Sequence, residues 1–140
     1  MKDPKYNSLN HAKFIIKYHF IFSTKYRRRL LFPLIDDLKN SFKRAESLAD
    51  RKWKIEIVEI DKNKADHVHF LVSARPQIAP FEIVHSLKQI STYDIWHSKW
   101  FNYLRNYYWK QHHLWTRGYF CSTIGDVSTK TIMEYIEKQG

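Results

Sequence analysis

The stretch Asp66-His67-Val68-His69-Phe70-Leu71-Val72-Ser73 decides the fold of this chain. It reads as a β-strand between an Asp61-Lys62-Asn63-Lys64 turn and the strand-ending Arg75-Pro76 pair. Successive side chains of a strand point to opposite faces, so His67 and His69 project together while Val68, Phe70 and Val72 point into a core. The stretch therefore predicts a strand with one core face and one face that carries two histidines.

Other elements extend outward from this strand in both directions. Alternation predicts strands over residues 13–24, 53–60 and 115–123, and apolar residues at helical spacing predict a helix from Pro33 to Asp50. Pro80 can open a second helix, and Ser128 or Thr129 can cap a short final helix over about residues 128–139. Residues 96–114 resist assignment. The order β-α-β-β-α-β-α predicts a single α+β domain over residues 1–140. It would be a ferredoxin-like (RRM-like) antiparallel sheet with helices on one face, plus a C-terminal helix that carries Tyr135.

Composition narrows the kind of partner. The 140-residue chain has a formal net charge of +10 and a pI of about 9.7, which favours a polyanion, although a merely basic soluble protein would look the same. Aromatic residues make up 16% of the chain, and aromatic rings interleaved with cations suit unpaired nucleic acid. One cysteine, Cys121, excludes an internal disulfide framework and fits a reducing cytoplasm. No run of 18 apolar residues exists, so we expect no membrane partner.

The histidine pair and the C-terminus together suggest chemistry. Two imidazoles can hold a divalent metal ion and leave coordination positions open for phosphate and water. Tyr135 and Gln139 are spaced i, i+4, so on a helix they share one side, where an amide oxygen could complete the site and a phenol could attack phosphorus. The pattern predicts metal-assisted phosphoryl transfer with a tyrosine nucleophile. Alternatively, each residue is structural: a hydrogen-bonded surface histidine, a packed tyrosine and a solvated helix end.

Three motifs and a basic tract resemble one family in combination. They are Asp66 to Ser73, Leu114-Trp115-Thr116-Arg117-Gly118-Tyr119-Phe120, Tyr135-Ile136-Glu137-Lys138-Gln139 and the early tract Lys25-Tyr26-Arg27-Arg28. The chain resembles the single-tyrosine HUH transposases of bacterial and archaeal insertion sequences (the TnpA class), from about Tyr18 to Gln139. Each motif is common by itself, and the combination is specific.

The resemblance implies an activity and a set of residue roles. Family members cut single-stranded DNA, keep a 5′-phosphotyrosine on the enzyme and release a 3′-hydroxyl that can later rejoin the strand. By motif position, Tyr135 would be the nucleophile, and His67, His69 and Gln139 would bind a divalent metal ion, Mg²⁺ or Mn²⁺. The family also implies a DNA hairpin as target and a homodimer, in which the tyrosine helix of one subunit can complete the site of the other.

Two further groups of residues are candidates for DNA contact. The first is the basic tract, which could contact the DNA backbone or a hairpin and consists of Lys25, Tyr26, Arg27, Arg28 and Arg29. The second is Lys88, which could contact a phosphate. Alternatively, the tract is a solvated loop and Lys88 is a solvated helix residue. The aromatic residues from Trp96 to Trp109, interleaved with Lys and Arg, could form a stacking surface or could instead be core or dimer packing.

Three other functions remain open from the sequence. A domesticated relative could nick palindromic genomic repeats without mobilising an element. A non-catalytic RRM-like protein could bind nucleic acid on the same sheet. A metal-dependent nuclease could use water as the nucleophile and would form no protein–DNA adduct.

Overall fold

The computed structural model describes residues 15–124, 134 and 136–138. Within them, strands β1 (Ile16–Ser23), β2 (Trp53–Ile60), β3 (His67–Ala74) and β4 (Phe120–Ile124) form one antiparallel sheet in the order β2-β3-β1-β4. Helix α1 (Ile35–Leu48) connects β1 to β2, and α2 (Pro80–Trp96) connects β3 to β4. Each connected pair is separated in the sheet by one other strand. This is the split βαβ arrangement, and the prediction of an α+β ferredoxin-like sheet is confirmed.

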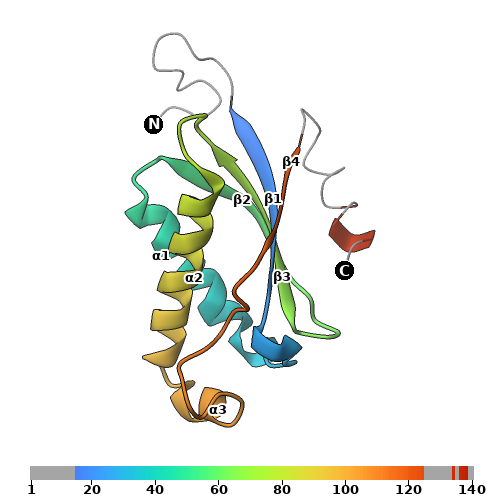
Figure 1. Cartoon of the computed structure of the whole chain (residues 1–140), viewed down its shortest axis with the longest axis vertical. Coiled ribbons are helices and arrows are strands. Elements are labelled where there is room, and N and C mark those ends of the chain that lie inside the picture. The colour runs from blue at the N-terminus through green and yellow to red at the C-terminus, as the bar shows by residue number, and fades with distance from the viewer. Residues whose placement is uncertain (1–14, 125–133, 135, 139–140) are drawn as a thin grey trace.

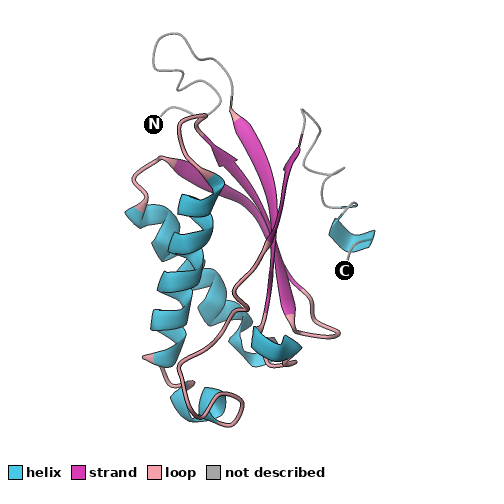
Figure 2. Cartoon of the chain, in the orientation of Figure 1, coloured by secondary structure: helices cyan, strands magenta, loops and turns pink. Residues whose placement is uncertain are grey.

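Both long helices pack against one face of the sheet (Figure 1; Figure 2). That face carries fully buried aromatic rings: Phe22 and Phe70 lie 4.9 Å apart between ring centroids, and Phe42 of α1 lies 4.8 Å from Phe70. Removing such apolar surface from water is the main stabilising term of a domain of this size. No helix among residues 15–124 or in the described C-terminal turn is long and apolar enough to cross a bilayer.

A polar clamp joins the two long helices. Asp94 of α2 accepts hydrogen bonds from Ser41 Oγ at 2.7 Å and from Arg44 Nε at 2.9 Å, both on α1. A second bond, from Arg44 Nη2 to the other carboxylate oxygen at 2.6 Å, makes the arginine contact bidentate. Burial by itself would raise the pKa of the Asp94 carboxyl, but these bonds outweigh burial and lower it.

The last strand is shorter than the sequence predicted. Trp115 was expected to begin a strand running to residue 123, but it makes only an isolated bridge to Thr24, and β4 begins at Phe120. The physical reason is that the backbone carbonyls of residues 116–118 accept hydrogen bonds from the Lys88 ammonium, so they do not pair with a neighbouring strand.

Smaller differences concern element ends and the unassigned stretch. The strand predicted over residues 13–24 is β1, and the helix predicted from Pro33 to Asp50 is α1, which follows a short 3₁₀ turn at Phe32–Leu34. The region 96–114 contains one short helix, α3 (Phe101–Arg105). Its aromatic residues divide between two environments, since Trp96 and Tyr108 are buried whereas Trp109 is 69% exposed.

The predicted C-terminal helix falls mostly outside the described residues. Residues 134 and 136–138 are helical, and buried Ile136 packs with Ile57 of β2 and Leu71 of β3. Leu71 alternates with Phe70 and Val72, so this contact lies on the sheet face opposite α1 and α2. Figure 1 shows the same placement, with the helical turn near the C-terminus beyond the far side of the sheet.

Candidate metal centre

The sheet face opposite the helices carries the predicted histidine pair. His67 and His69 alternate with core residues along β3, and both are buried despite lying off the main core. Their ring centroids are 5.2 Å apart, with the ring planes at 77°. The structure therefore brings the two imidazoles together on one face, as strand alternation predicted.

The ring of His67 is oriented by a carboxylate. Its Nδ1 lies 2.7 Å from Asp66 Oδ1, and the second carboxylate oxygen accepts a bond from Arg27 Nε at 3.1 Å. Burial opposes ionisation of Asp66, but the hydrogen bonds from His67 and Arg27 outweigh it and lower the pKa of the carboxyl. With Nδ1–H donated to a carboxylate, Nε2 is the nitrogen left to act as a ligand.

The ring of His69 is oriented by a second histidine that the sequence did not single out. His19 of β1 places Nε2 3.0 Å from His69 Nδ1, and the two rings stack with centroids 5.2 Å apart. Burial, followed by repulsion from His19 and His67, lowers the pKa of His69 to about 4. His69 is thus neutral at pH 7, the form in which an imidazole binds metal.

The donor set fits a divalent metal ion. The buried Nε2 of His69 has no hydrogen-bond partner among residues 15–124 and the described C-terminal turn, and a buried polar atom is normally satisfied. Both histidines thus use Nδ1 for an orienting contact, the pattern typical of metal-bound imidazoles.

A second group of possible metal ligands includes His67. Ligand atoms of Asp61, Asp66 and His67 lie within 4.8 Å of one another. Asp61 Oδ2, however, already accepts a backbone N–H bond from Lys64 at 2.7 Å, and Asp66 is bonded through both oxygens. The histidine pair is therefore the better donor set, with Asp66 orienting one of its rings.

The basic tract, residues 25–29, follows β1. Tyr26, Arg27, Arg28 and Arg29 are all exposed and Lys25 is half-buried, but Arg27 also forms an ion pair with Asp66. The tract therefore reaches both the histidine site and solvent, and its contact with DNA stays a prediction.

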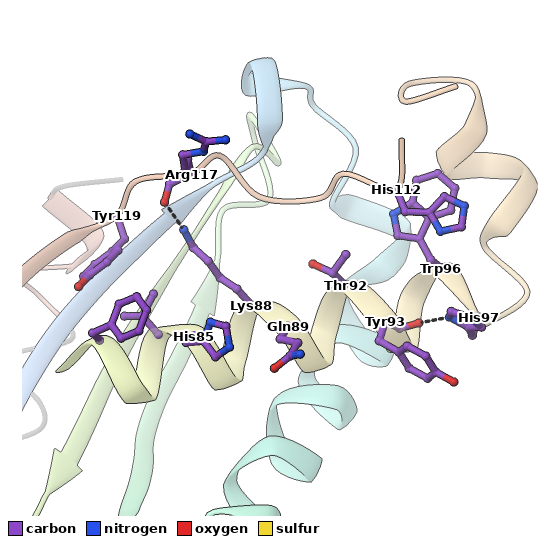
Figure 3. A pocket seen from close by; sticks show the side chains of 12 residues that line it. His85, Lys88, Gln89, Thr92, Tyr93, Trp96, His97, His112, Arg117 and Tyr119 are labelled. Atoms are coloured by element: carbon purple, nitrogen blue, oxygen red, sulfur yellow. Dashed lines mark hydrogen bonds between the residues drawn. The ribbon is translucent and has the colours of Figure 1, made fainter. Parts of the chain in front are cut away.

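Lys88 makes three hydrogen bonds within the protein. Its Nζ donates to the carbonyls of Thr116, Arg117 and Gly118 at 2.8, 3.1 and 2.9 Å, and Figure 3 shows it reaching toward the main chain at Arg117. Burial lowers the pKa of this ammonium. These contacts give Lys88 a structural role, and the predicted phosphate contact stays a prediction.

The predicted nucleophile and third ligand, Tyr135 and Gln139, lie outside the described residues. Their described neighbour Ile136 packs on the face that carries the histidines, through Leu71. Sequence reasoning missed His19, whose only sequence signal is its place on the polar face of the predicted first strand. Its importance depends on β1 pairing with β3, which periodicity does not give.

Comparison with known proteins identifies the family. The family described as "Transposase IS200 like" matches residues 12–139, nearly the whole chain. The chain belongs to the IS200-like transposases. The match includes the histidine strand, the basic tract and the C-terminal Tyr135 and Gln139.

Relatives of this IS200-like transposase are themselves described as transposases. The chain is 32% identical to the transposase for insertion sequence element IS200 of Salmonella typhimurium, over 99% of this chain and 85% of the relative. It is 30% identical to the ISDra2 transposase TnpA of Deinococcus radiodurans, over 89% of this chain and 84% of that protein. The predicted resemblance to the TnpA class is confirmed.

Solved structures agree on the fold of the transposase. A crystal structure of a candidate transposase from Deinococcus radiodurans superposes with a TM-score of 0.67 at 28% identity, covering 90% of this chain and 92% of that one. A REP-associated tyrosine transposase bound to a REP hairpin gives a TM-score of 0.56 at 13% identity, covering 87% and 62% of the two chains. At that identity the second likeness concerns the fold alone.

Proposed function

We propose that this transposase cuts and rejoins single-stranded DNA at insertion-sequence ends through a covalent 5′-phosphotyrosine on Tyr135. His67, His69 and Gln139 would hold the divalent metal ion, Mg²⁺ or Mn²⁺. The observation that carries the proposal is the pair of buried histidines. Each uses Nδ1 for a contact within the protein and leaves Nε2 as the nitrogen that can bind a metal ion. Membership of the IS200-like family supports the assignment of DNA as substrate.

The proposed reaction is an exchange of ester bonds. The Tyr135 phenol oxygen forms a bond to phosphorus and loses its proton, while the bond from phosphorus to the 3′-oxygen breaks and that oxygen leaves as a hydroxyl. Because one phosphodiester replaces another, a later 3′-hydroxyl can reverse the step and rejoin the strand without ATP. When bound, the metal ion polarises the scissile phosphate and helps to orient it.

Residues of the chain prepare the site for this exchange. Asp66 and His19 hold the rings of His67 and His69 so that their Nε2 atoms act as the ligands. Exposed cations of the basic tract would contact the phosphates on either side of the cleavage position.

The deciding experiment is mass spectrometry of the protein after incubation with Mn²⁺ and single-stranded DNA from the flanks of its own gene. We expect a DNA adduct at Tyr135 that is absent from Tyr135→Phe and from samples treated with a chelator. Tyr93→Phe is the matched control, because Tyr93 is 58% exposed on α2 and should leave the adduct unchanged. Cleavage without an adduct would contradict the proposal and favour water as the nucleophile.

The ligand set has its own test. His69→Ala should abolish Mn²⁺ binding measured by titration calorimetry, whereas Asp61→Asn should change the dissociation constant little. The reverse result would assign the metal ion to the Asp61, Asp66 and His67 group instead.

We also propose a homodimer that binds a DNA hairpin, on the family relationship. Mixing His67→Ala protein with Tyr135→Phe protein tests whether subunits share sites. If the tyrosine acts on the partner's histidines, mixed dimers contain one intact site and regain cleavage. If each subunit uses its own tyrosine, the mixture stays inactive.

A further inference from the structure

The turn after β1 has a strained backbone and exposes the aromatic side chain of Tyr26 to solvent. Tyr26 and Arg27 have φ angles of 62° and 53°, in the left-handed region that residues other than glycine seldom occupy. Such a conformation is strained and persists only when its surroundings enforce it. The Tyr26 ring is nevertheless 64% exposed, so burial of this ring does not account for the strain.

A neighbouring segment, residues 107–114, enforces the turn. Tyr108 donates a hydrogen bond from its hydroxyl to the Lys25 carbonyl at 2.7 Å, and the Lys25 amide donates to the Leu114 carbonyl at 2.9 Å. Tyr108 itself is buried, and burial raises the pKa of its hydroxyl to about 12, so it stays a donor at neutral pH. The turn and this segment therefore form one fixed surface.

Between the turn and this segment lies a hollow of about 260 Å³. The rings of Tyr26 and His113 border it at 84° to one another with centroids 6.3 Å apart, and Trp109, 69% exposed, lies along the same wall. The volume is below the roughly 300–1,000 Å³ of pockets that take drug-sized molecules, which points to a single ring system as the occupant.

The charges around the hollow select an anionic ligand. Among the described residues, Arg28 and Lys110 line it and no carboxylate does. The Lys25 ammonium and the Arg28 guanidinium lie 5.3 and 5.9 Å from the Tyr26 ring centroid. Exposed aromatic rings beside unpaired cations are the arrangement that binds a base through stacking and its phosphate through charge.

We propose that this hollow, bordered by Tyr26, Trp109 and His113, is a stacking site for one unpaired nucleobase of the DNA strand, with the adjoining phosphates on Lys25 and Arg28. The inference rests on the proposed function, since it assumes that the protein handles single-stranded DNA. It assigns base contact to Tyr26 and Trp109 and phosphate contact to their basic neighbours. Arg27, which is exposed and donates a hydrogen bond to Asp66, connects this surface with the histidine site.

The test compares two strands that differ only in their bases. Fluorescence anisotropy with a chelator present measures binding of an oligothymidylate of about 12 nucleotides and of an abasic strand with the same number of phosphates. The wild-type protein should prefer the oligothymidylate by about tenfold, the size expected from stacking of one base. Tyr26→Ser and Trp109→Ser should each remove most of this preference and leave affinity for the abasic strand unchanged.

Three further variants separate stacking from charge and from damage to the fold. Tyr26→Phe keeps the ring and should keep the preference. Phe32→Ser removes a ring that is 62% exposed outside the hollow and should also keep it. Arg28→Gln should weaken binding of both strands equally, because it removes a phosphate contact. Unchanged binding of the abasic strand shows that each serine variant remains folded.

The outcomes distinguish this site from the proposed reaction. If Tyr26→Ser and Trp109→Ser keep the full preference while the wild-type protein forms the Tyr135 adduct, the stacking site is wrong and the reaction stands. If the preference is lost in both variants but no adduct forms on any flanking DNA, the stacking site stands and the reaction is wrong. If the wild-type protein binds neither strand, the stacking site is wrong.

Discussion

Each histidine of the candidate metal centre has its ring orientation fixed by a hydrogen-bond partner. Asp66 orients His67 from the neighbouring position, and His19 orients His69 across the β1–β3 pairing. An imidazole that donates a hydrogen bond from Nδ1–H has a fixed ring plane and an unprotonated Nε2, which is what a metal ligand requires. The partners should therefore matter to metal binding nearly as much as the ligands.

Replacement of His19 by Phe tests this at the scale of one residue. The phenyl ring keeps the stacking volume beside His69 but removes the nitrogen that contacts its Nδ1. We expect the affinity for Mn²⁺, measured by titration calorimetry, to fall about 10- to 100-fold. His85→Phe changes an exposed histidine on α2 and should bind as the wild type does. An unchanged affinity in His19→Phe would show that His69 needs no orienting partner.

At the scale of elements, two polar contacts hold segments that periodicity alone would leave independent. The Asp94 clamp fixes α1 against α2, and Lys88 fixes the stretch that leads into β4. Both contacts involve a charged group that satisfies several partners at once, which makes them stronger than single neutral hydrogen bonds.

Asp94→Asn should lower the melting temperature by a few degrees at pH 7. The folded-state pKa of Asp94 lies below the ordinary 3.8, so its stabilising effect is complete above about pH 4 and is lost as the pH falls through the folded-state value. Thermal unfolding of both proteins from pH 7 to pH 3 should therefore show a difference that shrinks below pH 4. A difference that is constant over this range would mean that the carboxylate charge has no part in the clamp.

Lys88→Met should loosen the segment from Thr116 to Gly118, because three carbonyls lose a cationic donor. We expect a loss of about 1.5–3 kcal/mol in the free energy of unfolding, measured in urea. Hydrogen exchange should accelerate at residues 116–119 more than in β3. Equal acceleration throughout the chain would indicate general destabilisation and contradict a local role.

At the scale of the whole molecule, the net charge of +10 governs how the protein meets DNA. Each phosphate that the protein neutralises releases condensed counterions, so affinity for single strands falls with salt by a slope of about −0.7 per contact. The exposed arginines at 28 and 29 are candidates for such contacts, whereas Arg27 is held by Asp66.

Arg29→Gln should therefore reduce the slope of log affinity against log salt by about 0.7 when a single-stranded oligonucleotide is titrated. Lys39→Gln, which removes a charge from the exposed side of α1, should leave the slope as it is. If both variants change the slope by the same amount, DNA responds to total charge and the basic tract is not a specific contact.

The sequence by itself determined the faces and the order of the elements. Alternation along Asp66 to Ser73 placed both histidines on one side, and helical spacing located α1, because these periods follow from local backbone geometry. Pro80 marked the start of α2. Only the tertiary structure showed that His19 meets His69, that Arg27 meets Asp66 and that Lys88 shortens β4. The residues of each pair are distant in sequence. The hydrophobic periodicity of a strand or helix indicates which way a side chain points, but it does not indicate which residue of another element that side chain contacts. That depends on strand pairing and on how the helices pack against the sheet.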